Sequence, residues 1–251
     1  DYISINASAN SNEWDNPAEK STAIAFDKSA LNTGAGNDQI NLNANATGAE
    51  TYAYGALDSI INTGAGNDDL HINANTNDNT YWDPAVGLSN TLVDLGAGAD
   101  SLHLSANANG SGILKAYGAT NSIINTDNLS SPGGDDYISI NASANSNWGD
   151  NPAEKSTAIA FDKSTLNTGD GNDQINLNAN ATGSETYAYG ALDSIINTGA
   201  GNDNLAVNAN TNDNTNWDPA VGLSNTILDL GAGADSLSIN ANANGSGVLE
   251  A

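Results

Sequence analysis

The chain opens each of its recurring segments with a strict alternation of apolar and polar residues. Between Asp38 and Ala46 the even positions after the Asp hold Ile40, Leu42 and two alanines, whereas the odd positions hold glutamine and asparagines. A period of two places these side chains on opposite faces of a β-strand, one dry and one wet. The apolar side chains shrink from Ile and Leu to Ala, so we expect the core to narrow toward one end of the strand.

A second extended block follows in each segment. It reads AIAFDKSALNT from Ala23, AYGALDSIINT from Ala53, AVGLSNTLVDL from Ala85 and AYGATNSIINT from Ala116. β-Branched residues and Tyr favour a second strand here. The seventh position of the block is always Ser or Thr and the tenth is always Asn or Asp. Disordered acidic tails do not keep such columns, so we predict an ordered fold.

The sequence repeats at two levels. A unit of 135 residues that starts at Asp1 starts again at Asp136, and the second copy stops at Ala251 before it is complete. Within the first unit, alternating segments 30 to 37 residues apart begin at Asp1, Asp38, Asp68 and Asp100. We therefore divide the chain into repeat unit 1 (residues 1–135, four coils) and repeat unit 2 (residues 136–251, nearly four coils).

Tandem coils of this length with Gly-rich corners predict an all-β, parallel β-solenoid (a β-helix or β-roll). We expect about seven to eight coils in one continuous solenoid, stacked at about 4.8 Å. The alternative is a pair of tandem β-sandwich domains, one for each unit. A β-sandwich would not require the short inner repeat of 30 to 37 residues, so this alternative leaves that repeat unexplained.

A Gly-rich turn that ends in Asp precedes each alternating segment, as in Thr33-Gly-Ala-Gly-Asn-Asp38. Glycine lets the backbone curl and direct carbonyl groups inward, and Asp adds a charged oxygen. Carbonyl and carboxylate oxygens at flexible spacing are ligands for Ca²⁺. A column of stacked Asp side chains would also repel itself without a cation. The alternative is a plain Gly-Asn-Asp corner that holds no metal.

These turns resemble the RTX calcium-binding nonapeptide G-G-x-G-x-D-x-U-x. The stretch Leu31–Ile40 matches it at the second glycine, the fourth-position glycine, the Asp and the large apolar residue, whereas Thr, Leu or Ser replaces the first glycine. The resemblance implies a β-roll of large secreted or surface bacterial proteins, with Ca²⁺ between successive turns. The carboxylate ligands it implies are Asp38, Asp68, Asp100, Asp136, Asp173, Asp203 and Asp235. The backbone carbonyl ligands it implies are Gly34, Gly36, Gly64, Gly66, Gly169, Gly171, Gly199 and Gly201.

The charge of the chain excludes some partners. Thirty acidic residues face five lysines and no arginine, which gives a formal net charge of −25. Such a surface repels nucleic acid and anionic lipid, and it attracts divalent cations. No apolar run is long enough for a membrane span. The chain contains no cysteine, so no disulfide can stabilise the fold. We therefore expect no nucleic-acid partner and no membrane insertion.

The sequence also argues against an enzyme. It contains no nucleophile–His–acid set, and Lys20 and Lys28 with their copies lie beside Glu or Asp, as solvated ion pairs do. Asp68 and Asp69 are adjacent in a strand, so their carboxylates should point to opposite faces. The two histidines become alanine and serine in unit 2, which suggests exposed strand positions and no metal site.

Longer loops hold the four tryptophans near Asp and Pro. Exposed Trp can stack on sugar faces, so these loops are candidates for glycan contacts, or for packing against the solenoid or a neighbouring molecule. The four residues are Trp14, Trp82, Trp148 and Trp217.

We expect a non-enzymatic structural repeat of an extracellular filament, sheath, surface layer or giant adhesin, rigidified by Ca²⁺ at the stacked turns. Further copies of the chain, end to end or laterally, are the expected partners. The mechanism would be folding gated by Ca²⁺ outside the cell. The alternative is a carbohydrate-binding adhesin module that contacts surface glycan through the Trp loops.

Overall fold

The structure is a parallel β-solenoid. The computed structural model describes residues 1–11, 20–48, 50–78, 83–127, 133–146, 155–213, 218–245 and 249–250. These residues contain strands and no helix, so none of their elements is a helix that could span a membrane. The strands form sheets A, B and C, with eight, eight and seven strands. All described strand pairs are parallel, which confirms the predicted solenoid and shows that the tandem β-sandwich alternative is wrong.

Each coil contributes one strand to each sheet in turn. Sheet A contains β1 (Tyr2–Asn10), β4 (Gln39–Gly48), β7 (Asp69–Asp78), β10 (Ser101–Gly110), β13 (Tyr137–Ser146), β16 (Gln174–Gly183), β19 (Asn204–Asp213) and β22 (Ser236–Asn244). Sheet B contains β2 (Lys20–Asp27), β5 (Glu50–Leu57), β8 (Asp83–Ser89), β11 (Ile113–Thr120), β14 (Lys155–Asp162), β17 (Glu185–Leu192), β20 (Asp218–Ser224) and β23 (Leu249–Glu250). Sheet C contains β3 (Ala30–Asn32), β6 (Ile60–Asn62), β9 (Leu92–Asp94), β12 (Ile123–Asn125), β15 (Thr165–Asn167), β18 (Ile195–Asn197) and β21 (Ile227–Asp229).

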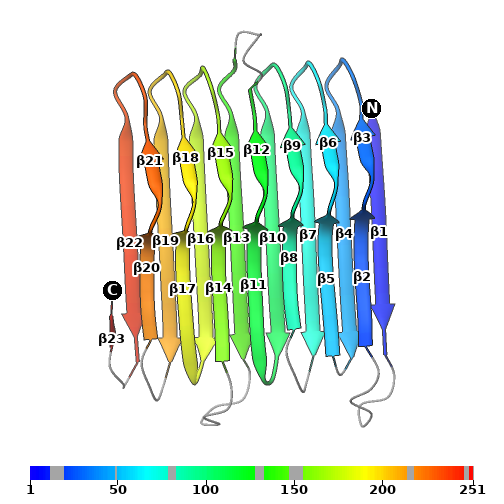
Figure 1. Cartoon of the computed structure of the whole chain (residues 1–251), viewed down its shortest axis with the longest axis vertical. Helices are drawn as coiled ribbons and strands as arrows, with labels where there is room; N and C mark the ends of the chain where they lie inside the picture. The colour runs from blue at the N-terminus through cyan, green and yellow to red at the C-terminus, as the bar shows by residue number, and fades with distance from the viewer. Residues whose placement is uncertain are drawn as a thin grey trace.

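The coil is flattened into two layers. Strands of sheet A run in one direction, and strands of sheets B and C run back in the other (Figure 1). The Gly-rich turns therefore lie together along one edge, between sheet C and the next strand of sheet A. The pairing of β10 with β13 carries sheet A across residue 135, so the two sequence units share one continuous sheet.

The register follows the spacing of the sequence segments. Ile3 lies opposite Ile40, Ile40 opposite Leu70, and Leu70 opposite Leu102. Every second residue of β4 is buried, which confirms the dry face predicted from the alternation. Because a slip of one residue would exchange the two faces, this alternation fixes the register.

The core narrows as predicted, because small side chains line one end of sheet A. These alanines pack with alanines of sheet B in a separate cluster, which contains Ala44, Ala46 and Ala74 from sheet A and Ala23 and Ala53 from sheet B. Glycines of sheet B allow a similarly close approach further along. A Cβ atom on Gly118 of β11 would lie 2.2 Å from the Ile140 Cγ2 atom and 2.4 Å from the Ala160 carbonyl oxygen.

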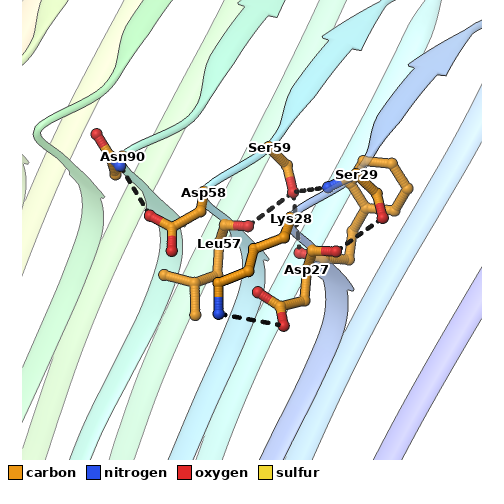
Figure 2. A network of polar contacts seen from close by, with 8 residues as sticks. Asp27, Lys28, Ser29, Leu57, Asp58, Ser59 and Asn90 are labelled. Carbon is orange, nitrogen blue, oxygen red and sulfur yellow. Dashed lines mark hydrogen bonds and ion pairs between the residues drawn. The ribbon is translucent and has the colours of Figure 1, made fainter.

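The corner between sheets B and C explains the recurring Ser or Thr of the second block. Asp58 and Asn90 adopt left-handed φ angles of 50° and 49°, a region that Asn and Asp tolerate better than most residues. After this corner, the Ser29 amide donates to the Ser59 hydroxyl oxygen at 3.2 Å, and that hydroxyl donates to the Leu57 carbonyl at 2.7 Å (Figure 2). The side chain thus links neighbouring coils at a point where the strand is broken.

The wet face of sheet A carries ladders of asparagine amides. Asn43 donates to Asn6 at 2.9 Å, and Asn73 donates to Asn43 at the same distance. In a second row of asparagines on the same face, the Asn107 side-chain amide donates to the Asn75 side-chain oxygen at 2.8 Å. Stacked amides of this kind stabilise parallel in-register strands along the axis.

We predict that Gly118→Ala destabilises the fold, because the added methyl group meets Ile140 and the Ala160 backbone closer than van der Waals contact allows. Overpacking of this kind costs about 1–3 kcal/mol. Denaturant unfolding of the variant measures the loss. Ile113→Val, on the same strand but partly exposed, is the control and should change the stability by less than about 0.5 kcal/mol. A Gly118→Ala protein as stable as wild type would mean that the two layers separate easily.

Candidate metal site at the Asp turns

The turn aspartates form a buried column along the solenoid axis. The backbone amide of each turn Asp donates to the Oδ1 atom of the turn Asp in the next coil, at 2.7–3.1 Å. Six of the side chains are only 1–3% exposed and the last is partly exposed. We call these residues the Asp column: Asp38, Asp68, Asp100, Asp136, Asp173, Asp203 and Asp235.

The asparagine before the Asp caps amides in the opposite direction. Asn37 Oδ1 accepts the Asn67 amide at 3.0 Å, and Asn67 Oδ1 accepts the Ala99 amide at 3.2 Å. In an Asn-Asp turn, the Asn side chain therefore accepts a backbone amide of the following coil, and the Asp side chain accepts one of the preceding coil. Sequence reasoning missed this role, although the Asn-Asp dipeptide at these turns was the available signal.

The predicted glycine ligands take part in backbone bonds between the turns. The carbonyl oxygens of one set accept an amide of the next coil at 2.8–2.9 Å; these are Gly34, Gly64, Gly169 and Gly199. The amides of the other set donate to a carbonyl of the next coil at 2.7–2.9 Å; these are Gly36, Gly66, Gly171 and Gly201. A Cβ atom on Gly64 would lie 1.7 Å from the Gly34 carbonyl oxygen, so these stacked turns require glycine.

One carboxylate oxygen in most of the column has no hydrogen-bond partner. The Oδ2 atoms of five column residues are buried without a partner: Asp38, Asp68, Asp100, Asp173 and Asp203. A buried, unpaired carboxylate oxygen is costly unless it holds a proton or a cation. The residues present fit Ca²⁺, because the available donors are hard oxygens in a row with one carboxylate per coil.

The middle of the column favours protonated carboxyl groups. Burial, together with the smaller effect of neighbouring carboxylates, raises the pKa of Asp100 to about 7 and that of Asp136 to about 8. Burial raises the pKa of Asp173 as well. At the first coil the Asp1 amino group and then the Thr33 hydroxyl lower the pKa of Asp38. The ionised form is thus unfavourable at Asp100, Asp136 and Asp173 unless a positive charge lies beside them.

The turn before Asp136 departs from the common sequence, because residues 132–135 read Pro-Gly-Gly-Asp where residues 34–37 read Gly-Ala-Gly-Asn, but it does not interrupt the column. The Asp100 amide donates to Asp136 at 2.7 Å, and the Asp136 amide donates to Asp173 at 2.9 Å. Thr126 donates its hydroxyl to the second oxygen of Asp136. Asp127 adds a carboxylate here and accepts the Asp170 amide at 3.0 Å, and burial raises its pKa to about 6.

Other candidate residues lie elsewhere. Asp68 is buried and Asp69 is partly exposed, which confirms that their side chains point to opposite faces. The histidines lie on the wet face of sheet A, where the ligand atoms of Asp69, His71 and His103 come within 4.8 Å of one another. The predicted glycan or packing residues Trp14, Trp82, Trp148 and Trp217 lie outside the described residues.

Two of the lysines form ion pairs with glutamates of the next coil. Lys20 lies 2.7 Å from Glu50, and Lys155 lies 2.8 Å from Glu185. The sequence suggested the adjacent Glu19 as a partner, and Glu19 lies outside the described residues. Both ion pairs lie on sheet B, on strands β2–β5 and β14–β17, and thus away from the Asp column.

We predict that, without divalent cations, wild-type stability falls relative to Asp100→Asn as the pH rises. The folded pKa of Asp100, about 7, exceeds its unfolded value of about 3.9, so the folded protein binds the proton more tightly. This contribution is complete below about pH 4 and is lost as the pH rises through about 7. Thermal unfolding of both proteins in a chelator measures it. Burial lowers the pKa of His103, so this residue changes the stability with pH in the opposite sense. Because both proteins contain His103, its effect cancels from the difference between them. Parallel pH profiles would contradict the prediction.

We predict that Asp100→Asn is more stable than Asp100→Ala at pH 8. Both variants remove the charge, but only asparagine keeps an oxygen for the Asp68 amide, which donates to Asp100 at 2.8 Å. Leaving that amide buried and unpaired costs about 1–3 kcal/mol. Equal stabilities in denaturant unfolding would mean that the side-chain cap contributes little.

Comparisons with known proteins assign no family to the chain. No protein-family model matches it, and no curated protein or solved structure matches it. The RTX-like resemblance therefore remains a prediction based on the turn motif, and the case for the site depends on the geometry of the Asp column.

Proposed function

We propose that the chain is a non-enzymatic structural repeat of an extracellular filament, sheath, surface layer or giant adhesin, and that Ca²⁺ along the Asp column makes it rigid. One observation carries the proposal. Five successive or near-successive coils each bury a carboxylate oxygen that has no hydrogen-bond partner. A single unsatisfied oxygen could be an isolated defect, but a regular row of them is what a row of cations would satisfy.

The column residues would hold the ion with the oxygens that the fold leaves free. The Oδ1 atoms cap backbone amides and fix each carboxylate in place, so the Oδ2 atoms are already oriented. The Gly34 and Gly64 carbonyls accept one amide each and keep a second lone pair. When bound, Ca²⁺ would supply the positive charge that protons otherwise supply to this column.

The acidic composition supports folding controlled by the cation. A chain with a net charge of −25 repels itself when it becomes compact. One divalent ion at each of the six steps of the column would neutralise about half of this charge. Because the site requires stacked coils, binding energy would become folding energy. The chain would then fold where Ca²⁺ is abundant, as it is outside cells.

The shape supports a structural role with further copies as partners. The sheets run unbroken through both sequence units (Figure 1), so continuous hydrogen-bonded ladders join all the coils along the stacking axis and would make that axis stiff. Ile60, Ile123 and Ile195 form an exposed row on sheet C that lateral association would cover.

We predict that Ca²⁺ restores stability lost in a chelator and that Mg²⁺ does so less well, because Mg²⁺ gives up its water reluctantly. A ligand at a hundred times its Kd adds about 2.7 kcal/mol per site. Thermal unfolding followed by far-UV circular dichroism measures the effect, which should be larger at pH 8 than at pH 5 because protons compete for the column.

The matched variants are Asp68→Asn and Asp58→Asn, which remove the same charge. Asp68 belongs to the column. Asp58 is an exposed corner residue whose carboxylate accepts a hydrogen bond from the Asn90 side-chain amide at 2.7 Å. Only Asp68→Asn should reduce the Ca²⁺ stoichiometry. A protein whose unfolding is indifferent to Ca²⁺ and chelator over this pH range would refute the proposed role of the cation.

A further inference from the structure

Three metal-ligating side chains meet on the outer face of sheet A, away from the Asp column. Asp69 and His71 are two residues apart on β7, so both point outward. His103 on β10 lies directly opposite His71 in the parallel register. One oxygen and two imidazole nitrogens come within 4.8 Å of one another. The offset between the two strands thus assembles a cluster from residues 32 positions apart in the sequence.

The contacts hold the three side chains in partly open positions. His71 Nε2 lies 2.8 Å from Asp69 Oδ1, with side-chain exposures of 34% and 37%. The imidazole rings of His71 and His103 stack with centroids 4.5 Å apart and 12° between their planes. Gln39 approaches the other oxygen of Asp69 at 3.5 Å, and the Ser101 hydroxyl lies 3.4 Å from His103 Nε2.

The donor set differs from that of the Asp column. Two imidazoles and one carboxylate suit zinc, copper, nickel or cobalt, whereas Ca²⁺ prefers oxygen ligands alone. In its neutral form each imidazole keeps one ring nitrogen with a free lone pair, and this is the atom that binds such an ion. Asp69 can then balance the charge of the ion.

We propose that Asp69, His71 and His103 bind one late first-row divalent transition-metal ion on the outer face of the solenoid. Imidazole lone pairs lie in the ring planes, and the nearly parallel stacked rings direct them side by side. Binding therefore requires the rings to rotate out of the stack and toward a common point, which their partial exposure permits. Three protein ligands leave a further coordination position for water or for a donor of another molecule.

Unit 2 provides an internal control on the same scaffold. Its β19 and β22 pair in the same register, and Ala206 lies opposite Ser238 where unit 1 places the two histidines. Asn204 takes the position of Asp69. Unit 2 thus keeps the backbone without the ligands, so substitutions copied from it should leave the fold intact.

The test is titration of the full, untagged chain with Zn²⁺ by calorimetry, in saturating Ca²⁺ so that the Asp column does not compete. Wild type should bind one equivalent. The variant Asp69→Asn/His71→Ala/His103→Ser should lose this site and keep its Ca²⁺ response. The converse variant, Asn204→Asp/Ala206→His/Ser238→His, should bind two equivalents. Circular dichroism checks that each variant is folded.

Cobalt gives a second readout, because its visible absorption reports nitrogen ligation and a low coordination number. The band should appear with wild type and be absent from the triple variant. Zn²⁺ binding that is equal in wild type and the triple variant would overturn the proposal and leave the histidines as a solvated stacked pair. This inference is independent of the proposed Ca²⁺ role, since it depends on the difference in bound Zn²⁺ between wild type and the triple variant, and both proteins have the same Asp column.

Discussion

The stack of coils depends on a buried carboxylate in each turn accepting a backbone amide from the coil before it. The Asp38 amide needs Asp68, and the Asp68 amide needs Asp100. Each coil is therefore incomplete without its neighbour, which makes the fold cooperative along its axis. The same arrangement places like charges in a column with little solvent, so the interaction that joins the coils also opposes them. A proton or a cation at the free oxygen removes that conflict.

The alternation of the sequence was enough to predict the strands of sheet A, their dry face and the parallel stacking. The prediction succeeded because only one register places all the apolar residues of such a strand, for example Ile40 and Leu42, on the buried face. The path of the coil was harder to predict. Sheet C has strands of only three residues, and its corner depends on left-handed residues such as Asp58 and Asn90. Such residues have no hydrophobic pattern, so the three-sheet cross-section was not evident before the structure.

The site was predicted only in part, because one residue can serve two purposes. The Gly-Asp motif pointed to Ca²⁺, and the structure gives Asp68 a role in backbone capping that needs no metal. The capping role explains Oδ1 but not the buried Oδ2, and this second oxygen separates the two interpretations. The histidine cluster was missed because the replacement of His71 and His103 in unit 2 was taken as evidence against a metal site. Their proximity depends on the strand offset, which becomes evident only when the coils are stacked.

The differences between the two units indicate where the solenoid can acquire specific functions. Buried positions exchange one aliphatic residue for another, as in Ile72 and Val207, and such exchanges preserve the stacking. Outward positions change chemical class, as in His71 and Ala206. The interior therefore limits every coil to the same cross-section, whereas outward positions of sheet A outside the asparagine ladders, such as those of His71 and His103, vary between the units. A ligand site on that face can be gained or lost within one unit without cost to the Asp column, because the two groups point to opposite sides of the same strand.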